Sequence, residues 1–326
     1  MLASRERERP EFNERSIFPL EFDVTEAEPA TTNPPTASPP SEQTASAHTT
    51  ADNLPLTIIE PQSGLGLGVL TEVWRFRELL LFLVWRDVKI RYKQTVIGVL
   101  WAVLQPVMVM GVMTFALGRV AGEPGSAIPY WLFVLAGLVP WTFLASAVSG
   151  AGMSIVANQQ LVTKVYFPRV LLPLSAAGLA GVDFLVGCGV LAAAACFAAP
   201  APGWHLLALP LAIAVLILVA AGLGLLLAAV TVKYRDFRVV LPLLIQMWLF
   251  LTPAIYLQAS TNLGAIGEVV QLLNPAHGVI AAFRAATLGT PFDWEAFATS
   301  AAVGTILFVI GLWYFHKVER SFADVI

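Results

Sequence analysis

Hydrophobic positions gather in six long runs that begin after residue 95. Each run is near or above the roughly 20 apolar residues that a helix needs to cross about 30 Å of hydrocarbon. The runs extend approximately over residues 96–117, 131–156, 170–199, 204–232, 239–257 and 297–315. The pattern predicts an all-α integral membrane protein with six transmembrane helices, which together form a domain at residues 96–316.

The segment at residues 63–95 mixes cations with large apolar side chains and has no uncharged stretch long enough to span. On a helical wheel, five charged residues gather within roughly 80°: Arg75, Glu78, Arg86, Lys89 and Lys93. This favours an amphipathic helix in the membrane interface, with its cations toward water. Phe82 lies inside the polar sector and Arg77, Asp87 and Arg91 lie outside it, so part of the helix is expected to contact protein. A solvated juxtamembrane anchor is the alternative.

Residues 1–62 have a different composition, rich in Thr, Ser, Pro, Ala and Glu. Five prolines between residues 29 and 40 exclude a regular helix there. The low hydrophobicity leaves nothing to offset the entropy of ordering the backbone. No apolar run follows the first arginines, so the segment lacks the form of a signal peptide. We expect a disordered cytoplasmic tail.

Two short apolar helices are expected between the fifth and sixth runs, at residues 263–273 and 278–288, separated by Asn274-Pro275. Each is too short to cross a membrane. Half-helices occur at membrane depth only where protein or a water-filled cavity satisfies their backbone. We therefore expect a re-entrant outer helical hairpin before the last span. An interfacial cap is the alternative.

The 19 Lys and Arg residues are sorted unevenly along the chain. Thirteen flank the start of the first run, the second-to-third and fourth-to-fifth connections, and the end of the last run. The connections on the other side contain two, Arg119 and Arg284. Because cations beside short loops are retained in the cytoplasm, both termini are expected there, with residues 317–326 as a cytoplasmic C-terminus.

The composition of the chain excludes several classes of function. Apolar and aromatic residues make up 57% of the 326 residues and charged residues 13%, against about 25% charged in a soluble domain. The net charge of −3 provides no basic field for nucleic acid. The four His residues are scattered and not spaced as metal ligands, and no lysine lies in a Walker A motif. We expect a transport subunit, not an enzyme, with ATP and Mg²⁺ bound by a separate polypeptide and neither cofactor nor metal bound by this chain.

Two connections on the expected cytoplasmic side have the composition of docking contacts. The first, at residues 158–169, is too polar to span. The second, at residues 233–238, places aromatic residues beside charges on a short turn. A cationic retention loop without a partner is the alternative for both.

Aromatic and polar side chains also lie within the predicted spans. Aromatic faces stack on sugar rings, and amides and hydroxyls bond to sugar hydroxyls. The candidates for such a substrate path are Trp101, Gln105, Trp141, Gln246, Trp248 and Tyr256. An interfacial aromatic belt is the alternative for residues near the ends of spans. Asp183, inside the third run, indicates either a functional site or a buried structural hydrogen bond.

In this order, the segments resemble the permease subunits of ABC exporters for O-antigen, teichoic acid and related cell-surface polysaccharides, the type 2 ABC exporter permeases. The resemblance covers residues from about 72 to 326. It is strongest at residues 85–106, WRDVKIRYKQTVIGVLWAVLQP, and at residues 319–326, ERSFADVI. Weaker matches lie at residues 166–169, 234–236, 251–256 and 273–277.

The resemblance implies a homodimer around a channel, with two copies of a nucleotide-binding ATPase subunit, in the bacterial cytoplasmic membrane. The implied cargo is a lipid-linked polysaccharide. It implies a gate-helix role for Arg86, Lys89, Arg91 and Tyr92. It implies coupling to the ATPase for Asn158, Lys164, Tyr166, Arg169, Tyr234, Arg235 and Asp236. An ABC exporter of a drug or small lipid, a non-ABC flippase and a membrane glycan transferase are the alternatives.

Overall fold

The computed structural model describes residues 67–93, 100–117, 128–198, 204–234, 236–252 and 264–319, together with Phe322. They belong to one compact unit, Pro61–Ile326. Helices and no strands form among them, which confirms the all-α class. The tail predicted at residues 1–62 lies outside the described residues.

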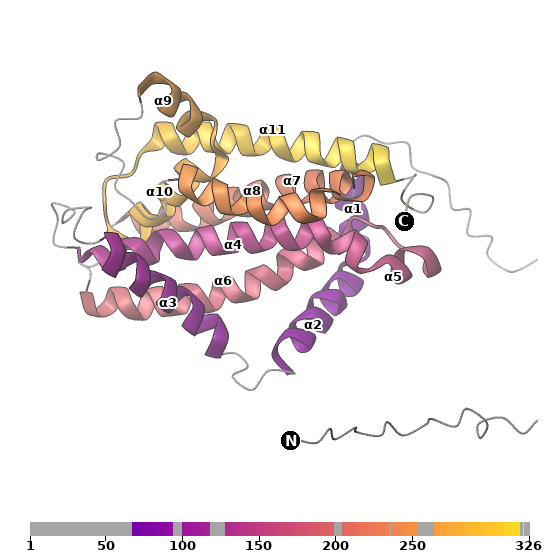
Figure 1. Cartoon of the computed structure of the whole chain (residues 1–326), viewed down its shortest axis with the longest axis horizontal. Coiled ribbons are helices and arrows are strands. Elements are labelled where there is room, and N and C mark those ends of the chain that lie inside the picture. Colours follow the sequence, from indigo (N-terminus) through magenta and orange to yellow (C-terminus); the bar gives the residue numbers. More distant parts are fainter. Residues whose placement is uncertain are drawn as a thin grey trace, which may run out of the picture. The chain divides into compact units, whose positions relative to one another are not determined.

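Eleven α-helices and one 3₁₀ helix occur in the part of the chain that the structure describes (Figure 1). In chain order they are α1 (Leu67–Arg75), α2 (Arg77–Lys93), α3 (Leu100–Leu117), α4 (Tyr130–Ala157), α5 (Gln159–Lys164), α6 (Leu171–Ala198), η1 (Trp204–Ala208), α7 (Leu209–Lys233), α8 (Phe237–Leu251), α9 (Gly264–Leu273), α10 (Pro275–Leu288) and α11 (Trp294–Glu319).

Four of the six predicted spans have helices long and apolar enough to cross a membrane. These are α4, α6, α11 and the helical segment His205–Lys233, which contains α7. The first and fifth predicted spans correspond to shorter apolar helices, Leu100–Ala116 and Phe237–Leu251. Residues 96–99 and 253–257, which the prediction included in these spans, lie outside the described residues.

Helix α4 is the central element, because it packs against α3, α6, α7, α8 and α10. Most of its side chains are buried. Beside it, α7 and α11 approach each other closely at two glycines, Gly222 and Gly311. A Cβ atom at Gly311 would lie 2.3 Å from the carbonyl oxygen of Gly222. Small residues at such crossings let the two backbones pack closely.

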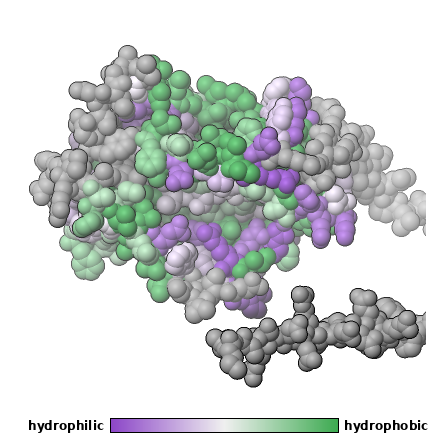
Figure 2. All heavy atoms as spheres, viewed as in Figure 1, coloured by the Kyte–Doolittle hydropathy of each residue, from purple (hydrophilic) through white to green (hydrophobic). Residues whose placement is uncertain are grey.

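Two hydrophobic clusters lie toward opposite ends of these helices. One contains Ile155 at the end of α4, Val162 of α5, Val232 at the end of α7 and Phe315 near the end of α11; we call this the α5 end. The other joins the start of α4 to α10 and to Phe297 at the start of α11. The helix ends that the cation pattern assigns to the cytoplasm therefore meet at one end. Figure 2 shows hydrophilic atoms over α2 and α5 and hydrophobic atoms over much of the same face.

The two helices predicted between the fifth and sixth runs are present as α9 and α10. Helix α10 begins at Pro275, three residues earlier than predicted, because proline is well accommodated in a first helical turn. Asn274 caps it by accepting a bond from the Ala276 amide at 3.1 Å. Gly289, with φ of 69°, ends it in the left-handed conformation. Its side chains are mostly buried, and it packs on α4, α7 and α11.

The predicted interfacial helix is divided into α1 and α2 at Phe76. Backbone hydrogen bonds of 3.0 Å, from Phe76 to Glu72 and from Leu80 to Phe76, continue across the break. Helix α2 packs on α6 and buries Leu83, so the expected contact with protein is confirmed. The interfacial location stays a prediction.

Candidate functional site

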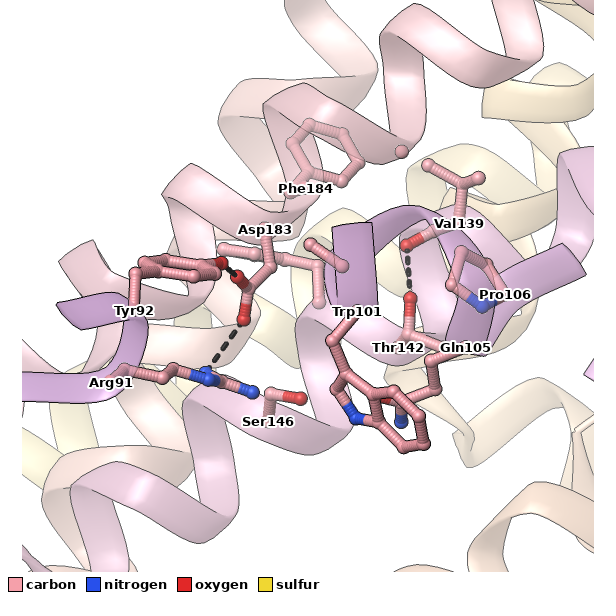
Figure 3. A pocket seen from close by; sticks show the side chains of 13 residues that line it. Arg91, Tyr92, Trp101, Gln105, Pro106, Val139, Thr142, Ser146, Asp183 and Phe184 are labelled. Carbon is pink, nitrogen blue, oxygen red and sulfur yellow. Dashed lines mark hydrogen bonds and ion pairs between the residues drawn. The ribbon is translucent and has the colours of Figure 1, made fainter. Parts of the chain in front are cut away.

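A cavity of about 390 Å³ lies among α2, α3, α4 and α6 (Figure 3). It brings together residues that the sequence analysis had assigned to different roles. Arg91 and Tyr92 come from the predicted gate helix, Trp101 and Gln105 from the predicted substrate path, and Asp183 from the third predicted span. We call this space the Asp183 cavity.

Asp183 is the charged centre of this cavity, because two side chains of α2 bind its carboxylate. The Arg91 guanidinium lies 2.7 Å from Oδ2 of Asp183, and the Tyr92 hydroxyl donates to Oδ1. Figure 3 shows both bonds reaching α6 from the end of α2. A carboxylate inside a helical bundle is costly without such partners, so the pairing explains how α6 accommodates it.

The Tyr92 hydroxyl keeps its proton over the physiological pH range. Burial and, next, the hydrogen bond to Asp183 raise the pKa of Tyr92 to about 12. Tyr92 therefore acts as the donor, and the Asp183 carboxyl oxygen as the acceptor, in the bond between α2 and α6.

Trp101 and Gln105 lie four residues apart on α3, so both face the same side of that helix. Both are exposed, Trp101 with half of its surface accessible. The cavity wall also carries the hydroxyls of Thr142 and Ser146 from α4. Thr142 donates to the Val139 carbonyl at 3.0 Å. An indole face, an amide and a carboxylate together suit a ligand rich in hydroxyl groups.

Trp141 and Trp248 do not line the Asp183 cavity. Their rings meet edge to face with centroids 5.3 Å apart, and Trp141 is only 4% exposed. The Trp248 indole donates to Oδ1 of Asn274 at 2.9 Å, and the Asn274 amide donates to Thr252 at 2.8 Å. We call these four residues the Asn274 network. It ties α8 to the start of α10.

Of the other two candidates for the substrate path, Gln246 alone lies among the described residues. Gln246 is exposed on α8. Tyr256 lies outside the described residues. The structure thus divides the predicted path into a cavity, a buried network and an exposed position.

The first predicted coupling connection contains α5. Lys164 and Tyr166 are exposed, Tyr166 by 84%. Asn158 accepts a 3.1 Å hydrogen bond from the Arg86 guanidinium, which also lies 2.8 Å from Asp87. A predicted coupling residue is therefore bonded directly to the predicted gate helix.

Arg169 is bound to the C-terminal segment of the chain. Its amide donates to Oε1 of Glu319 at 3.2 Å, and its guanidinium donates to the Glu319 carbonyl and lies 6.0 Å from the centre of the Phe322 ring. Phe322 is fully buried and meets Phe315 edge to face at 5.4 Å. From the sequence, residues 319–326 supported the family resemblance and belonged to the expected cytoplasmic C-terminus, with no contact predicted for them. In the sequence, the aromatic side chain of Phe322 among polar neighbours was the signal for this buried position.

The second predicted coupling connection joins α7 to α8. Tyr234 and Asp236 are exposed, and Arg235 lies outside the described residues. Val232, two residues before Tyr234, packs in the same cluster as Val162 of α5. Both connections therefore lie at the α5 end.

No group of His, Cys, Asp and Glu side chains that could hold a metal ion occurs among the described residues. The site offers hydrogen-bonding and stacking groups together with one ion pair. Such a set of groups is chemically suited to binding and positioning a ligand.

Comparison with known proteins gives one family and several relatives. Residues 78–288 match the family described as ABC-2 type transporter. The O-antigen export system permease protein RfbA of Myxococcus xanthus is 27% identical over 261 residues, which cover 80% of this chain and all of that protein. Two proteins of the same name from Klebsiella pneumoniae are each 27% identical over 252 residues, 76% of this chain and 95% of theirs. These matches confirm the resemblance to exporter permeases, and the chain belongs to the ABC-2 type transporter family.

Proposed function

We propose that this chain is the membrane-spanning permease subunit of an ATP-driven exporter of a lipid-linked cell-surface polysaccharide. The observation that carries the proposal is the similarity to three O-antigen export permeases over 95–100% of their length. The ABC-2 family match argues against a non-ABC flippase or a membrane glycan transferase.

The proposed arrangement in the bacterial cytoplasmic membrane is six spans with both termini in the cytoplasm. Helices α3 and α8 would belong to the first and fifth spans, and α9 with α10 would form a re-entrant outer hairpin. The burial of α10 among α4, α7 and α11 supports the hairpin, because protein then satisfies its backbone.

A second copy of the chain would complete the channel as a homodimer. Helices α3 and α8 expose large apolar residues, such as Phe115 and Phe250. They also expose Trp101, Gln105 and Gln246. Faces that mix aromatic and amide side chains suit a path in which a glycan makes weak, repeated contacts.

Energy would come from two copies of a separate ATPase subunit that binds ATP and Mg²⁺. The joint location of α5 and the 233–238 connection at the α5 end supports docking of one partner against both. Lys164, Tyr166, Tyr234 and Asp236 are exposed there. The hydrogen bond that Asn158 accepts from Arg86 connects this surface to α2, so movement of a docked partner would be transmitted to the gate helix.

The cargo is tested by deleting the gene and analysing surface polymers. We expect one polysaccharide to disappear from the surface while its lipid-linked form accumulates inside. Deleting the partner ATPase should have the same effect, and restoring this chain should reverse the first deletion. Normal surface polysaccharide with altered resistance to a drug, or with altered lipid export, would support the alternative within ABC transport.

Docking is tested with the double substitution Lys164→Glu and Tyr166→Ala. Because both side chains are exposed, we expect normal protein levels and a loss of ATPase co-purification of at least fivefold. Thr163→Ala, at the exposed position of α5 next to Lys164, is the control. Unchanged co-purification would remove α5 from the interface.

A further inference from the structure

We infer that Asp183 is a positioning residue for transport: by binding Arg91 and Tyr92 it holds the C-terminal end of α2 against α6 and so closes one side of the Asp183 cavity. The inference rests on the proposed function, because it assigns the contact that keeps the gate helix in place.

The contact uses both oxygens of one carboxylate. Oδ2 faces the Arg91 guanidinium at 2.7 Å and Oδ1 accepts the Tyr92 hydroxyl. Arg91 and Tyr92 are consecutive, so their side chains leave α2 about 100° apart. Two bonds that reach one acceptor from different directions fix the rotation of α2 about its axis as well as its distance from α6.

A second contact precedes this one on both helices. Val84 of α2 occupies the space left by Gly178 of α6, where a Cβ atom would lie 2.6 Å from the valine Cγ2. Gly178 and Asp183 are five positions apart, which corresponds to about 7.5 Å along α6. Helix α2 is therefore held at two levels, by close packing at Gly178 and by charge at Asp183.

The bonds to Asp183 also set the condition under which the end of α2 can move away from α6. Withdrawing Arg91 and Tyr92 would leave the Asp183 carboxylate, whose side chain is 22% exposed, without these two partners inside the bundle, which is unfavourable. Release therefore requires other donors at the carboxylate. Hydroxyl groups of a ligand in the adjoining cavity, beside Trp101 and Gln105, have the right chemistry to supply them.

Charge exchange tests this assignment. In a background with Cys188 and Cys196 replaced by alanine, spin labels at Lys93→Cys on α2 and Leu185→Cys on α6 report the separation of the helices; both positions are exposed. With Asp183 unchanged, we expect a single narrow distribution of distances between the two labels. Asp183→Asn should broaden it and reduce export at least tenfold, with unchanged protein level and ATPase co-purification.

The paired exchange of Asp183→Arg with Arg91→Asp restores the ion pair but not the acceptor of the Tyr92 hydroxyl. It should therefore narrow the distribution in part, relative to Asp183→Asn, and restore part of the export. Gly178→Ala should broaden the distribution too, whereas Gly181→Ala should not, because a Cβ at Gly181 meets nothing within 4 Å. The distances do not depend on the cargo, so they test the inference even if the exported molecule is not a polysaccharide. The assignment is overturned if Asp183→Asn leaves the distribution narrow, or if the exchange restores neither the distances nor export.

Discussion

The Asp183 cavity and the Asn274 network are built from the same kinds of residue, yet they differ in what remains accessible. In the network, Trp141 and Asn274 are 4% and 6% exposed, and Asn274 bonds to Trp248, Thr252 and the Ala276 amide. In the cavity, Trp101 is half exposed and Gln105 is exposed. Tryptophan and amide side chains therefore stabilise helix packing in one region and are available to a ligand in the other.

Substitutions that disturb the network should lower stability, and substitutions at the cavity should lower transport alone. The largest loss is expected for Gly278→Ala, just inside the network end of α10. The new Cβ would lie 1.8 Å from the Ala296 carbonyl oxygen. It would also strain the 2.8 Å hydrogen bond that the backbone amide of residue 278 donates to the Ser300 hydroxyl. We expect a loss of about 3 kcal/mol, measured as thermal unfolding in detergent. Gly189→Ala on α6, where nothing lies within 4 Å of a new Cβ, is the control. Equal unfolding temperatures for the two variants would contradict the close packing of α10 on α11.

Asn274→Ala should have the next largest effect. It removes the cap of α10 and leaves the Trp248 indole N–H without its acceptor, whereas the Thr252 hydroxyl loses the Asn274 amide but keeps its bond to the Trp248 carbonyl. Losing a cap costs about 1 kcal/mol and a buried group without a partner about 1 to 3 kcal/mol. We expect about 2 kcal/mol in total, because hydrogen bonds between membrane helices average less than in water-soluble proteins. The same unfolding assay measures it, and a parent-like midpoint would show that the network contributes nothing.

Trp248→Phe separates the hydrogen bond from the ring contact. Phenylalanine keeps an aromatic edge against Trp141 but cannot donate to Asn274. We expect a loss of about 1 kcal/mol and normal export. Loss of export in a variant that is present at normal level would instead place Trp248 in the substrate path, as the sequence analysis had suggested.

Trp101→Ala should have the smallest effect on stability, within about 0.5 kcal/mol, because the side chain is half exposed. Export should fall several-fold if the ring stacks on the cargo. Met108→Ala, a truncation at an exposed position of the same helix, is the matched control. The same export from both variants would exclude an essential role for the indole.

Local signals predicted the boundaries that short-range chemistry controls. Asn274-Pro275 located the break between α9 and α10 because a cap and a proline act on adjacent backbone groups. The break at Phe76 had no such signal, and its backbone hydrogen bonds continue almost as in one helix. The contact between Arg169 and Glu319 joins residues 150 positions apart, beyond any periodic pattern.

By itself, the sequence determined the helical class, the apolar segments, the sorting of cations and the residue types available for binding, because hydropathy, charge and helical periodicity are local properties. The tertiary structure decided which of these residues meet. It paired Asp183 with Arg91 and Tyr92, withdrew Trp141 and Trp248 into a buried network, and placed Phe322 beneath Arg169. Those outcomes depend on how close-packed helices cross, and crossings are set by side-chain shape along whole helix faces.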